Sequence, residues 1–401
     1  MDETVLEGSA IVARVTPGPK YVEVGLSSAS AVDYEALRAA EQDYTWREGL
    51  ARSPRILRGT VPDDYRDAVL ELSGFCQYYS GLLGRREMRD PSDRLAIAQE
   101  AFESMLPGWE ELRGVASRAA QPFLDDPAVL KAGRAVAEAF VTPYLIEAPV
   151  LRQTFDKPFG YPGDFVLMQY YFDNAFVGDS AFGMVFHKTT CEHPLAVGVR
   201  TRAQWVADRI AERAKQVNGS GPVRVLSLGC GVAPEVAMVH RERGVPTSAV
   251  EWTLIDQEDR ALAAAHRNAR AGIPEGEAPP NIRCLNVSFS RLFRGEEDPG
   301  LWGPQDIMFA MGLFDYLPTG GAQMLLAAMY GLVQPGGNVY IGNASGPNDY
   351  FWELELALRW TLLYRGEGEM GALAAGLPAD ASVSVQTEPA GAYHILSCQK
   401  P

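Results

Sequence analysis

The feature of the sequence best suited to hold a ligand is a glycine-rich turn. The apolar segment 223–228 runs directly into Gly229, Cys230 and Gly231, and a helical pattern begins at Pro234. Glycine lets the backbone turn tightly and lets a ligand approach it closely, while the first turn of a helix offers free N–H groups. A dinucleotide-binding turn would carry glycine at position 234, so the proline there disfavours a pyrophosphate ligand. The turn suits S-adenosylmethionine (SAM), which has no pyrophosphate, and a purely structural turn is the alternative.

A carboxylate follows the next predicted strand. The segment 250–255 ends in Asp256 and Gln257. A carboxylate at this strand end can accept hydrogen bonds from both ribose hydroxyls of an adenosine ligand. The alternative is an aspartate that caps the following helix, which is a common role for this residue type. Because the glycine turn lies at the matching upstream position, we expect Asp256 and Gln257 to contact the ligand.

Polar residues also end the third predicted strand, 282–287. Asn286, Val287 and Ser288 lie there. A polar side chain at this point is well placed to meet the amino edge of an adenine. The pattern is common in strands without a ligand, so it supports the glycine turn and Asp256 and does not stand without them.

The fourth predicted strand, 306–311, supplies the last group of candidates. It is followed by Gly312, Phe314, Asp315 and Tyr316. The carboxyl ends of parallel strands share one edge of a sheet, and open α/β sheets bind ligands at that edge. We assign Gly312 and Phe314 to cofactor binding, and Asp315 and Tyr316 to catalysis, close to where a methyl acceptor should lie.

The segment 151–200 is rich in aromatic residues and glycines, with a centre that reads Phe-Gly-Tyr-Pro-Gly-Asp over positions 159–164. Glycines beside an aromatic residue allow a sharply turned loop, which we predict folds as a lid over the donor. Tyr161 would face the sulfonium or the substrate, and Asp164 would pair with the ammonium of SAM. Tyr171 and His187 are further candidates for catalysis, and a structural connector is the alternative interpretation of the whole segment.

The elements that must position these residues alternate between strand and helix after residue 222. Strands are predicted at 223–228, 250–255, 282–287, 306–311 and 338–341, and helices at 201–216, 234–243, 257–271 and 320–333. Such alternation is typical of a parallel sheet that is covered on both faces. A helix at 349–364 and a terminal hairpin of strands 383–387 and 393–397 complete the pattern. The predicted fold class is α/β with a C-terminal β-hairpin.

The sequence before residue 150 has a different pattern. Residues 1–30 are expected to form an extended arm, and helical spacing predicts helices at 33–52, 62–84, 92–106 and 127–146, the third ending before Pro107. We therefore predict three parts. They are a mostly helical domain at 1–150 for substrate covering or oligomerisation, a lid and connector at 151–200, and a ligand-binding domain at 201–401.

Composition excludes several classes of protein. The 401 residues contain 36 Lys and Arg against 51 Asp and Glu, a formal net charge of −15, which disfavours a nucleic-acid partner. No apolar run approaches the roughly 20 residues of a membrane span, and the acidic N-terminus is unlike a secretory signal. Five widely spaced cysteines without a CxxC pair predict reduced thiols, no metal site and a cytoplasmic location.

Taken together, residues 200–401 resemble class I SAM-dependent methyltransferases. The segment 156–164, Asp-Lys-Pro-Phe-Gly-Tyr-Pro-Gly-Asp, resembles a motif of the bacterial methyltransferases of 3-hydroxypalmitic acid methyl ester (extracellular factor) biosynthesis, and 312–317 and 360–365 are similar to later motifs of that group. The chain departs from the group at Pro162 and at Ala233 of the glycine turn. The resemblance implies a Rossmann-like sheet, a helical N-terminal region and SAM as the cofactor.

The sequence therefore predicts a SAM-dependent methyltransferase that acts on a small molecule in secondary or signal metabolite biosynthesis. The acceptor atom is left open among a carboxylate, a hydroxyl, an amine and a carbon, and homodimer formation is left open too. One alternative is a SAM enzyme of another reaction type, such as intramolecular cyclisation of the donor, and another is a non-catalytic SAM-binding protein. A nucleic-acid methyltransferase is disfavoured because the fourth strand lacks the Asn/Asp-Pro-Pro-Tyr/Phe turn.

Overall fold

The computed structural model describes residues 10–17, 22–28, 61–89, 91–217, 221–271, 273, 276–289, 291, 296, 302–346 and 351–401. The helix predicted at 33–52 lies outside the described residues. Near the N-terminus, β1 (Ala10–Pro17) and β2 (Val22–Ser28) pair as an antiparallel hairpin, so this part of the expected extended arm forms a small sheet.

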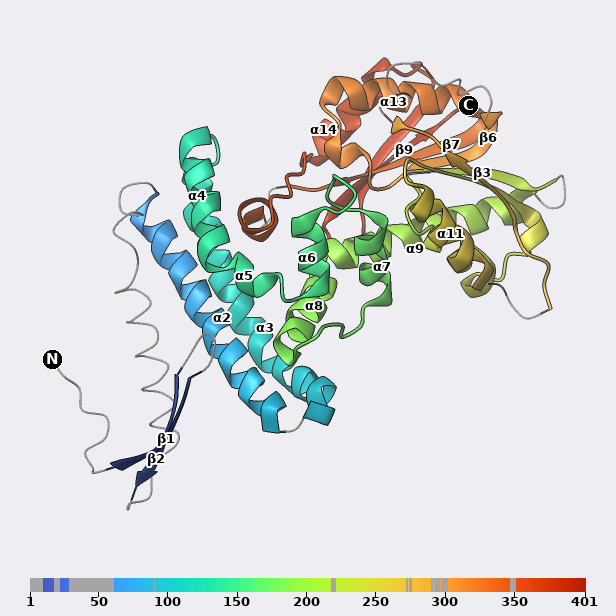
Figure 1. The fold of residues 1–401 in the computed structure, drawn as a ribbon. Coiled ribbons are helices and arrows are strands. Elements are labelled where there is room, and N and C mark those ends of the chain that lie inside the picture. Colours follow the sequence, from blue (N-terminus) through green and yellow to red (C-terminus); the bar gives the residue numbers. More distant parts are fainter. Residues whose placement is uncertain are drawn as a thin grey trace.

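A seven-stranded sheet forms the C-terminal part of the molecule (Figure 1). Its strands are β3 (Val223–Leu228), β4 (Val250–Asp256), β5 (Asn281–Asn286), β6 (Gln305–Ala310), β7 (Val333–Ala344), β8 (Ser382–Thr387) and β9 (Tyr393–Gln399). They are ordered β5-β4-β3-β6-β7-β9-β8, with β3 to β7 parallel and β9 antiparallel to both neighbours. The predicted α/β fold and its terminal hairpin are confirmed. The direction of strand addition reverses between β3 and β6, which opens a crevice at their carboxyl ends.

Both faces of the sheet are buried at its central strands β3, β4 and β6. The helices that cover it are α9 (Pro194–Val217), α10 (Pro234–Ala237), α11 (Asp259–Ala271), α13 (Thr319–Leu332) and α14 (Glu367–Ala372). Val225 and Phe309 share a core with α9 and α11, whereas Leu226 and Met308 share a core with α13. Because successive strand residues point to opposite faces, this division explains why β3 and β6 are mainly apolar.

A helical region precedes the sheet. It contains α2 (Asp63–Arg89), α3 (Arg94–Ala120), α4 (Pro127–Phe140), α5 (Thr142–Leu145), α6 (Pro149–Asp156), α7 (Phe165–Asp173) and α8 (Ala181–Glu192). In Figure 1, α6, α7 and α8 lie between the long helices α2 to α4 and the sheet. The fully buried rings of Tyr65, Trp109 and Phe182 belong to the core of this region.

That helical core also takes residues from the far end of the chain. Trp352 is fully buried in it and donates from Nε1 to the Tyr65 hydroxyl at 3.1 Å. Thr142 donates from its hydroxyl to the Ala357 carbonyl at 2.8 Å. The stretch 351–364, which follows β7, is therefore part of the helical core as well as of the ligand-binding half.

The prediction that the third helix ends before Pro107 was wrong. Helix α3 runs through Pro107 to Ala120, because Met105 and Trp109 on either side of the proline are both buried in the same core. Proline inside a helix costs about 3 kcal/mol through its missing N–H group and a steric clash, and here tertiary burial offsets that cost. The helix α2 likewise extends beyond the predicted residue 84, and the helix predicted at 127–146 is broken at Val141 into α4 and α5.

The helix predicted at 349–364 was also wrong in most of its length. Among its described residues, 351–364, helical structure is confined to 351–357, most of it the π-helix Trp352–Ala357, and Arg359 follows in a left-handed conformation with φ of 55°. The residues after it are held by other loops, because Leu363 donates its N–H to the Asp315 carbonyl at 2.8 Å. The apolar spacing that suggested a helix arises from burial against two different regions.

Candidate active site

A cavity of about 450 Å³ lies at the carboxyl ends of β3, β4 and β6. One wall is the sheet edge, and the others come from the 161–172 segment, α9 and residues 353–362. A volume of this size lies within the range of small-molecule sites, about 300–1,000 Å³. Ten of the predicted site residues line it: Tyr161, Tyr171, Gly229, Cys230, Gly231, Asp256, Gln257, Gly312, Asp315 and Tyr316.

The glycine turn forms the floor of the cavity. Gly229 and Cys230 both donate their N–H groups to the Ile255 carbonyl, at 2.9 and 3.0 Å, which fixes the turn to the end of β4. Gly229 and Gly231 have φ of 71° and 52°, the left-handed region that favours glycine. An added Cβ at Gly231 would meet nothing within 4 Å, so the backbone there faces open space. The turn therefore offers a ligand direct access to the main chain.

Asp256 joins this turn to the end of β4. Its Oδ2 accepts from the Gly231 N–H at 2.9 Å, and its Oδ1 accepts from the Glu258 N–H at 3.0 Å. The residue is 6% exposed, and burial raises the pKa of the carboxyl while these backbone N–H groups oppose the rise. Each carboxylate oxygen can accept two hydrogen bonds. The carboxylate therefore keeps acceptor capacity for a ligand in the cavity.

The turn between α6 and α7 covers this end of the cavity. Gly160 and Gly163 have φ of 82° and 75°, as the predicted sharp turn requires. Burial raises the pKa of Tyr161 to about 12 with a contribution from the nearby Asp256 carboxylate, and Gln257 hydrogen bonds to the Tyr161 side chain. The Tyr161 hydroxyl thus stays protonated at neutral pH and lies beside Asp256 and Gln257.

The same turn is docked on two aromatic side chains. A Cβ added at Gly163 would lie 2.6 Å from the Tyr316 hydroxyl and 3.1 Å from Cζ2 of Trp360. Tyr316 donates to the Pro162 carbonyl at 3.4 Å and accepts from Nε1 of Trp360 at 3.0 Å. Only glycine allows this approach, so Gly163 couples the turn to the roof formed by Tyr316 and Trp360.

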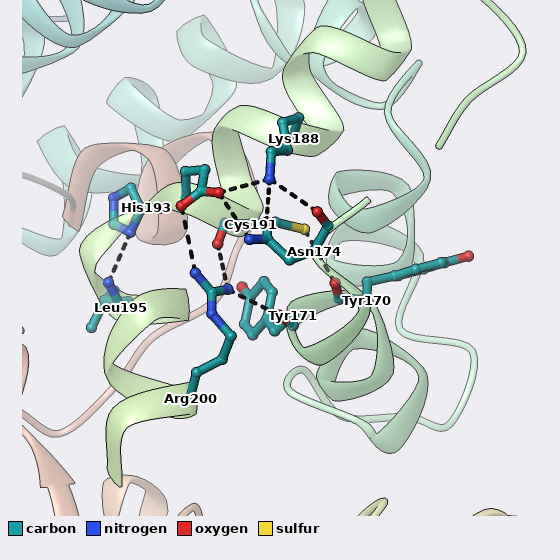
Figure 2. A network of polar contacts seen from close by, with 9 residues as sticks. Tyr170, Tyr171, Asn174, Lys188, Cys191, His193, Leu195 and Arg200 are labelled. Atoms are coloured by element: carbon teal, nitrogen blue, oxygen red, sulfur yellow. Dashed lines mark hydrogen bonds and ion pairs between the residues drawn. The ribbon is translucent and has the colours of Figure 1, made fainter. Parts of the chain in front are cut away.

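A polar network fixes α7, which carries Tyr171 and Phe172 to the cavity (Figure 2). Arg200 of α9 donates from Nη1 to the carbonyls of Tyr171 and Cys191, at 2.9 and 2.7 Å. Lys188 of α8 donates from Nζ to the Asn174 carbonyl at 2.9 Å, directly after α7 ends. These bonds join the C-terminal end of α7 to the corner between α8 and α9. The Tyr171 side chain is 5% exposed, and burial raises the pKa of its hydroxyl.

Asp315 lies in the wall between β6 and β7. Its Oδ1 accepts from the Ala344 N–H at 2.6 Å, and burial raises the pKa of the carboxyl to about 6 while the Arg202 charge opposes the rise. The buried Arg365 holds the surrounding loop, because its Nη1 donates to the Phe314 carbonyl at 2.8 Å. Arg365 therefore positions Asp315 through the backbone.

Six predicted site residues do not line the cavity: Asp164, His187, Asn286, Val287, Ser288 and Phe314. Asp164 caps α7, since its Oδ1 accepts from the N–H groups of Val166 and Leu167 at 2.9 and 3.0 Å, and its Oδ2 accepts from Gln153 at 2.8 Å. The structure gives it this capping role, and the contact with a donor ammonium stays a prediction.

His187 is buried in the helical region. Its Nδ1 accepts from the Val150 N–H at 3.2 Å in the first turn of α6, and burial lowers its pKa to about 4. The ring is neutral at physiological pH and away from the cavity, so it does not act on a ligand there. Phe314 is a core residue, fully buried beneath the β6 loop.

The segment 286–288 lies beside Asp256 at the outer edge of the sheet. Asn286 pairs with Asp256 across β5 and β4, and Val287 donates its N–H to the Asp256 carbonyl at 3.0 Å. Phe289, which directly follows this segment, does line the cavity, and Cζ of its ring would lie 3.7 Å from a Cβ added at Gly229. The segment 286–288, which was predicted to meet an adenine, is thus adjacent to the cavity, and Phe289 is the neighbouring residue that lines it.

Sequence reasoning missed further lining residues, among them Arg202, Glu235, Trp360 and Tyr393. Arg202 could have been identified from the sequence, because an arginine is unusual within an apolar helix face, here the face of α9 that contains Val199, Ala203 and Val206. Glu235 follows Pro234 in the turn, and burial raises its pKa to about 7. Trp360 comes from the loop after the π-helix Trp352–Ala357, and Tyr393 comes from the start of β9.

No group of three or more His, Cys, Asp or Glu side chains that could hold a metal ion occurs in the described part of the chain. The five cysteines are free thiols in this structure. Within the described ranges, no helix is both long and apolar enough to cross a lipid bilayer.

No protein-family model and no curated protein matches the chain. Solved structures do resemble it. Magnesium protoporphyrin IX methyltransferase from Synechocystis with bound SAM matches at 11% identity over 52% of this chain and 84% of its own, with a TM-score of 0.35. A protein described as a possible exported protein from Bordetella parapertussis matches at 16% identity over 76% and 97%, with a TM-score of 0.43. An O-methyltransferase family protein from Burkholderia thailandensis matches at 18% identity over 59% and 71%, with a TM-score of 0.36. None of these reaches 0.5, so the function proposed below rests on the cavity itself.

Proposed function

We propose that the protein is a SAM-dependent methyltransferase that acts on a small molecule. The observation that carries this proposal is the pairing of Asp256 with the open glycine turn, through the Gly231 N–H, at the edge of a cavity of about 450 Å³. A carboxylate with unused acceptor positions suits a ribose diol, and an open turn without a pyrophosphate pattern suits the rest of the donor.

The residues present fit SAM. Asp256 and Gln257 would hold the ribose, Phe289 and the adjacent 286–288 segment would border the adenine, and the main chain at Gly229 and Gly231 would border the amino-acid end. When bound, SAM supplies a methyl group on a sulfonium, which a nucleophile takes by in-line displacement. Aromatic faces near the cavity centre, such as Tyr161 and Tyr171, favour a cation at that point.

The acceptor side of the cavity is mainly aromatic and apolar. Its residues include Met168, Phe172, Leu354, Trp360 and Leu362. These side chains exclude water and orient a small apolar or aromatic acceptor beside the donor, which is what methyl transfer requires of a protein. For a hydroxyl acceptor, Asp315 is the base that we propose, since its pKa of about 6 leaves it ionised at neutral pH.

Tyr316 and Tyr171 are proposed to position the acceptor. Both line the cavity, and the Tyr316 hydroxyl is already held by Trp360 and the Pro162 carbonyl. The finer resemblance to the 3-hydroxypalmitic acid methyl ester group stays a prediction, as do the cytoplasmic location and the homodimer. The acidic net charge supports a small-molecule acceptor over a nucleic acid.

Calorimetry with SAM and with S-adenosylhomocysteine tests the donor site. Asp256→Ala should weaken both affinities at least tenfold, because charge-assisted hydrogen bonds are worth about 1.5–3 kcal/mol each. Asp259→Ala, at an exposed position of α11 three residues further along, is the matched control and should leave both affinities unchanged. Unchanged affinity in Asp256→Ala would refute the site.

Product analysis with labelled SAM tests the reaction type. Methyl label recovered in an acceptor, with release of S-adenosylhomocysteine, supports methyl transfer. Recovery of the amino-acid carbons of the donor in a small cyclic product would establish cyclisation in its place. Binding of SAM without any turnover across an acceptor screen would favour a non-catalytic binding protein.

A further inference from the structure

Arg202 of α9 is a buried cation that faces the cavity without a hydrogen-bond partner for one of its nitrogens. The residue is 5% exposed and lines the cavity. Its Nη1 is fully buried, and no acceptor within the described residues meets it. A buried donor that is left unsatisfied costs about 1–3 kcal/mol, and more when it is charged, so such a group in a cavity indicates an absent acceptor.

The guanidinium is held rigidly in this position. Its Cζ stacks 4.1 Å from the centre of the Tyr393 ring, at the start of β9. The ring can lie there because Gly198, one turn earlier in α9, has no side chain, and a Cβ at that position would be 2.6 Å from Cδ2 of Tyr393. Two residues therefore place Arg202 by packing alone, and its N–H groups remain available.

The other end of the guanidinium reaches the sheet edge. A Cβ added at Gly312 would be 3.5 Å from Nη2 of Arg202, so the cation lies directly beside the carboxyl end of β6. Asp315 and Glu235 are near enough for the Arg202 charge to favour their ionised forms. Neither of them forms an ion pair with Arg202 in the described structure. The N–H groups of the cation therefore remain available to a ligand in the cavity.

We propose that Arg202 binds the carboxylate of a ligand in this cavity. The planar fork of a guanidinium matches two carboxylate oxygens, and an arginine that stacks on an aromatic ring loses little freedom when it binds. One source of the carboxylate rests on the proposed function, namely the amino-acid end of SAM. The other source is a carboxylate on the acceptor.

The first arm of the test uses SAM and decarboxylated SAM, which keeps the adenosine, the sulfonium and the amine and lacks only the carboxylate. Calorimetry is performed on the wild type, on Arg202→Met and on Arg202→Lys. If Arg202 binds the donor, Arg202→Met should weaken SAM about tenfold or more and leave decarboxylated SAM unchanged. Arg202→Lys keeps the charge and should show an intermediate loss of SAM affinity. This variant provides the test if Arg202→Met does not fold.

A matched control comes from the same helix. Arg209 stacks on the Trp205 ring at 5.4 Å, as Arg202 stacks on Tyr393, but it does not line the cavity. Arg209→Met should therefore leave the affinities for both donors at the wild-type values. This control separates loss of a carboxylate contact from a general weakening of α9.

The second arm tests an acceptor carboxylate. Thermal shifts are measured with octanoate against octanamide and with benzoate against benzamide, on the protein alone and saturated with S-adenosylhomocysteine. If Arg202 binds the acceptor, the thermal shifts of the wild type should correspond to an affinity for each acid about tenfold higher than for its amide. Arg202→Met should lose that preference while its SAM affinity is unchanged.

The outcomes separate this proposal from the donor assignment. Failure of the wild type to bind SAM or decarboxylated SAM refutes the proposed function, while the acid and amide pairs on the free protein still test Arg202. The proposal is overturned if Arg202→Met keeps wild-type affinity for SAM and the wild type shows no preference for either acid that depends on Arg202.

Discussion

The cavity has two halves, a donor half and an acceptor half under the proposed function, and they are built in different ways. The donor half consists of main chain and one carboxylate, with Gly229, Gly231 and Asp256 fixed to strand ends by hydrogen bonds of 2.9–3.0 Å. The acceptor half consists of side chains, such as Tyr171, Trp360 and Leu362, that come from separate helices and loops. The comparison indicates that donor binding depends on local backbone geometry, whereas acceptor binding depends on how the helical region packs against the sheet.

The largest effect is expected from removing the ring that joins the two regions. Trp352→Ala should lower the free energy of unfolding by about 3–5 kcal/mol, because a fully buried indole leaves a cavity in the helical core. Urea unfolding measures this change. Calorimetry should show that the folded variant keeps its SAM affinity, and a parallel loss of SAM binding would contradict the independence of the donor half.

A pH effect of somewhat smaller size is expected at Glu235, in the donor half. Burial raises its pKa from 4.5 to about 7, so the folded state keeps a proton that the unfolded chain releases. This carboxyl therefore lowers stability as pH rises from about 4.5 to about 7, by up to roughly 3 kcal/mol. Glu235→Gln should gain stability relative to the wild type over this window in ligand-free urea unfolding. An equal difference at pH 4.5 and pH 7.5 would exclude the shift.

The open floor of the donor half can be closed with one methyl group. Gly231→Ala should weaken SAM at least tenfold, because the added Cβ enters the space that the turn leaves for a ligand. Its left-handed φ also costs about 1 kcal/mol of stability. Gly244 has a φ of 65° and open space around it but lies outside the cavity. Gly244→Ala should therefore lose the same stability through strain and keep its SAM affinity.

The roof of the acceptor half offers a matched pair of glycines. Gly163→Ala and Gly160→Ala should each lower stability by about 1–2 kcal/mol through left-handed strain. Only the first places a Cβ against Tyr316 and Trp360, so only it should shift tryptophan fluorescence and slow turnover. Identical behaviour of the two variants would show that the docking of the turn has no role in the site.

The smallest effect is expected at Asp164. As a helix cap, Asp164→Ala should lower stability by about 1 kcal/mol without a change in SAM affinity. If calorimetry showed a tenfold loss of SAM with little loss of stability, the ammonium contact expected from the sequence would be correct and the capping role secondary.

The donor half could be predicted from the sequence because its signals are local. The glycine turn, Asp256 and Gln257 lie within one strand-turn-helix-strand unit, and each lies at a strand end. The strands and the terminal hairpin were predicted for the same reason, since alternation and chain breaks are read within a few residues.

The acceptor half could not be predicted in the same way. Trp360 and Tyr393 reach the cavity through contacts with residues more than 40 positions away, such as Tyr316 and Arg202. Asp164 and His187 lie outside the lining of the cavity, which their residue types did not reveal, because a buried polar side chain that caps a helix has the same residue type as one that binds a ligand. Pro107 was misread since burial on both sides of it outweighed its local preference.

The hydrogen bond between Tyr65 and Trp352 spans 287 positions of the chain, which has a consequence for synthesis on the ribosome. Domains generally fold as they emerge, N-terminal first. Here the helical core lacks the Trp352 ring until the residues after β7 have been made, so helices α2 to α4 leave the ribosome with an open apolar groove. Completion of that core is therefore one of the last events of folding, and it coincides with closure of the acceptor side of the cavity.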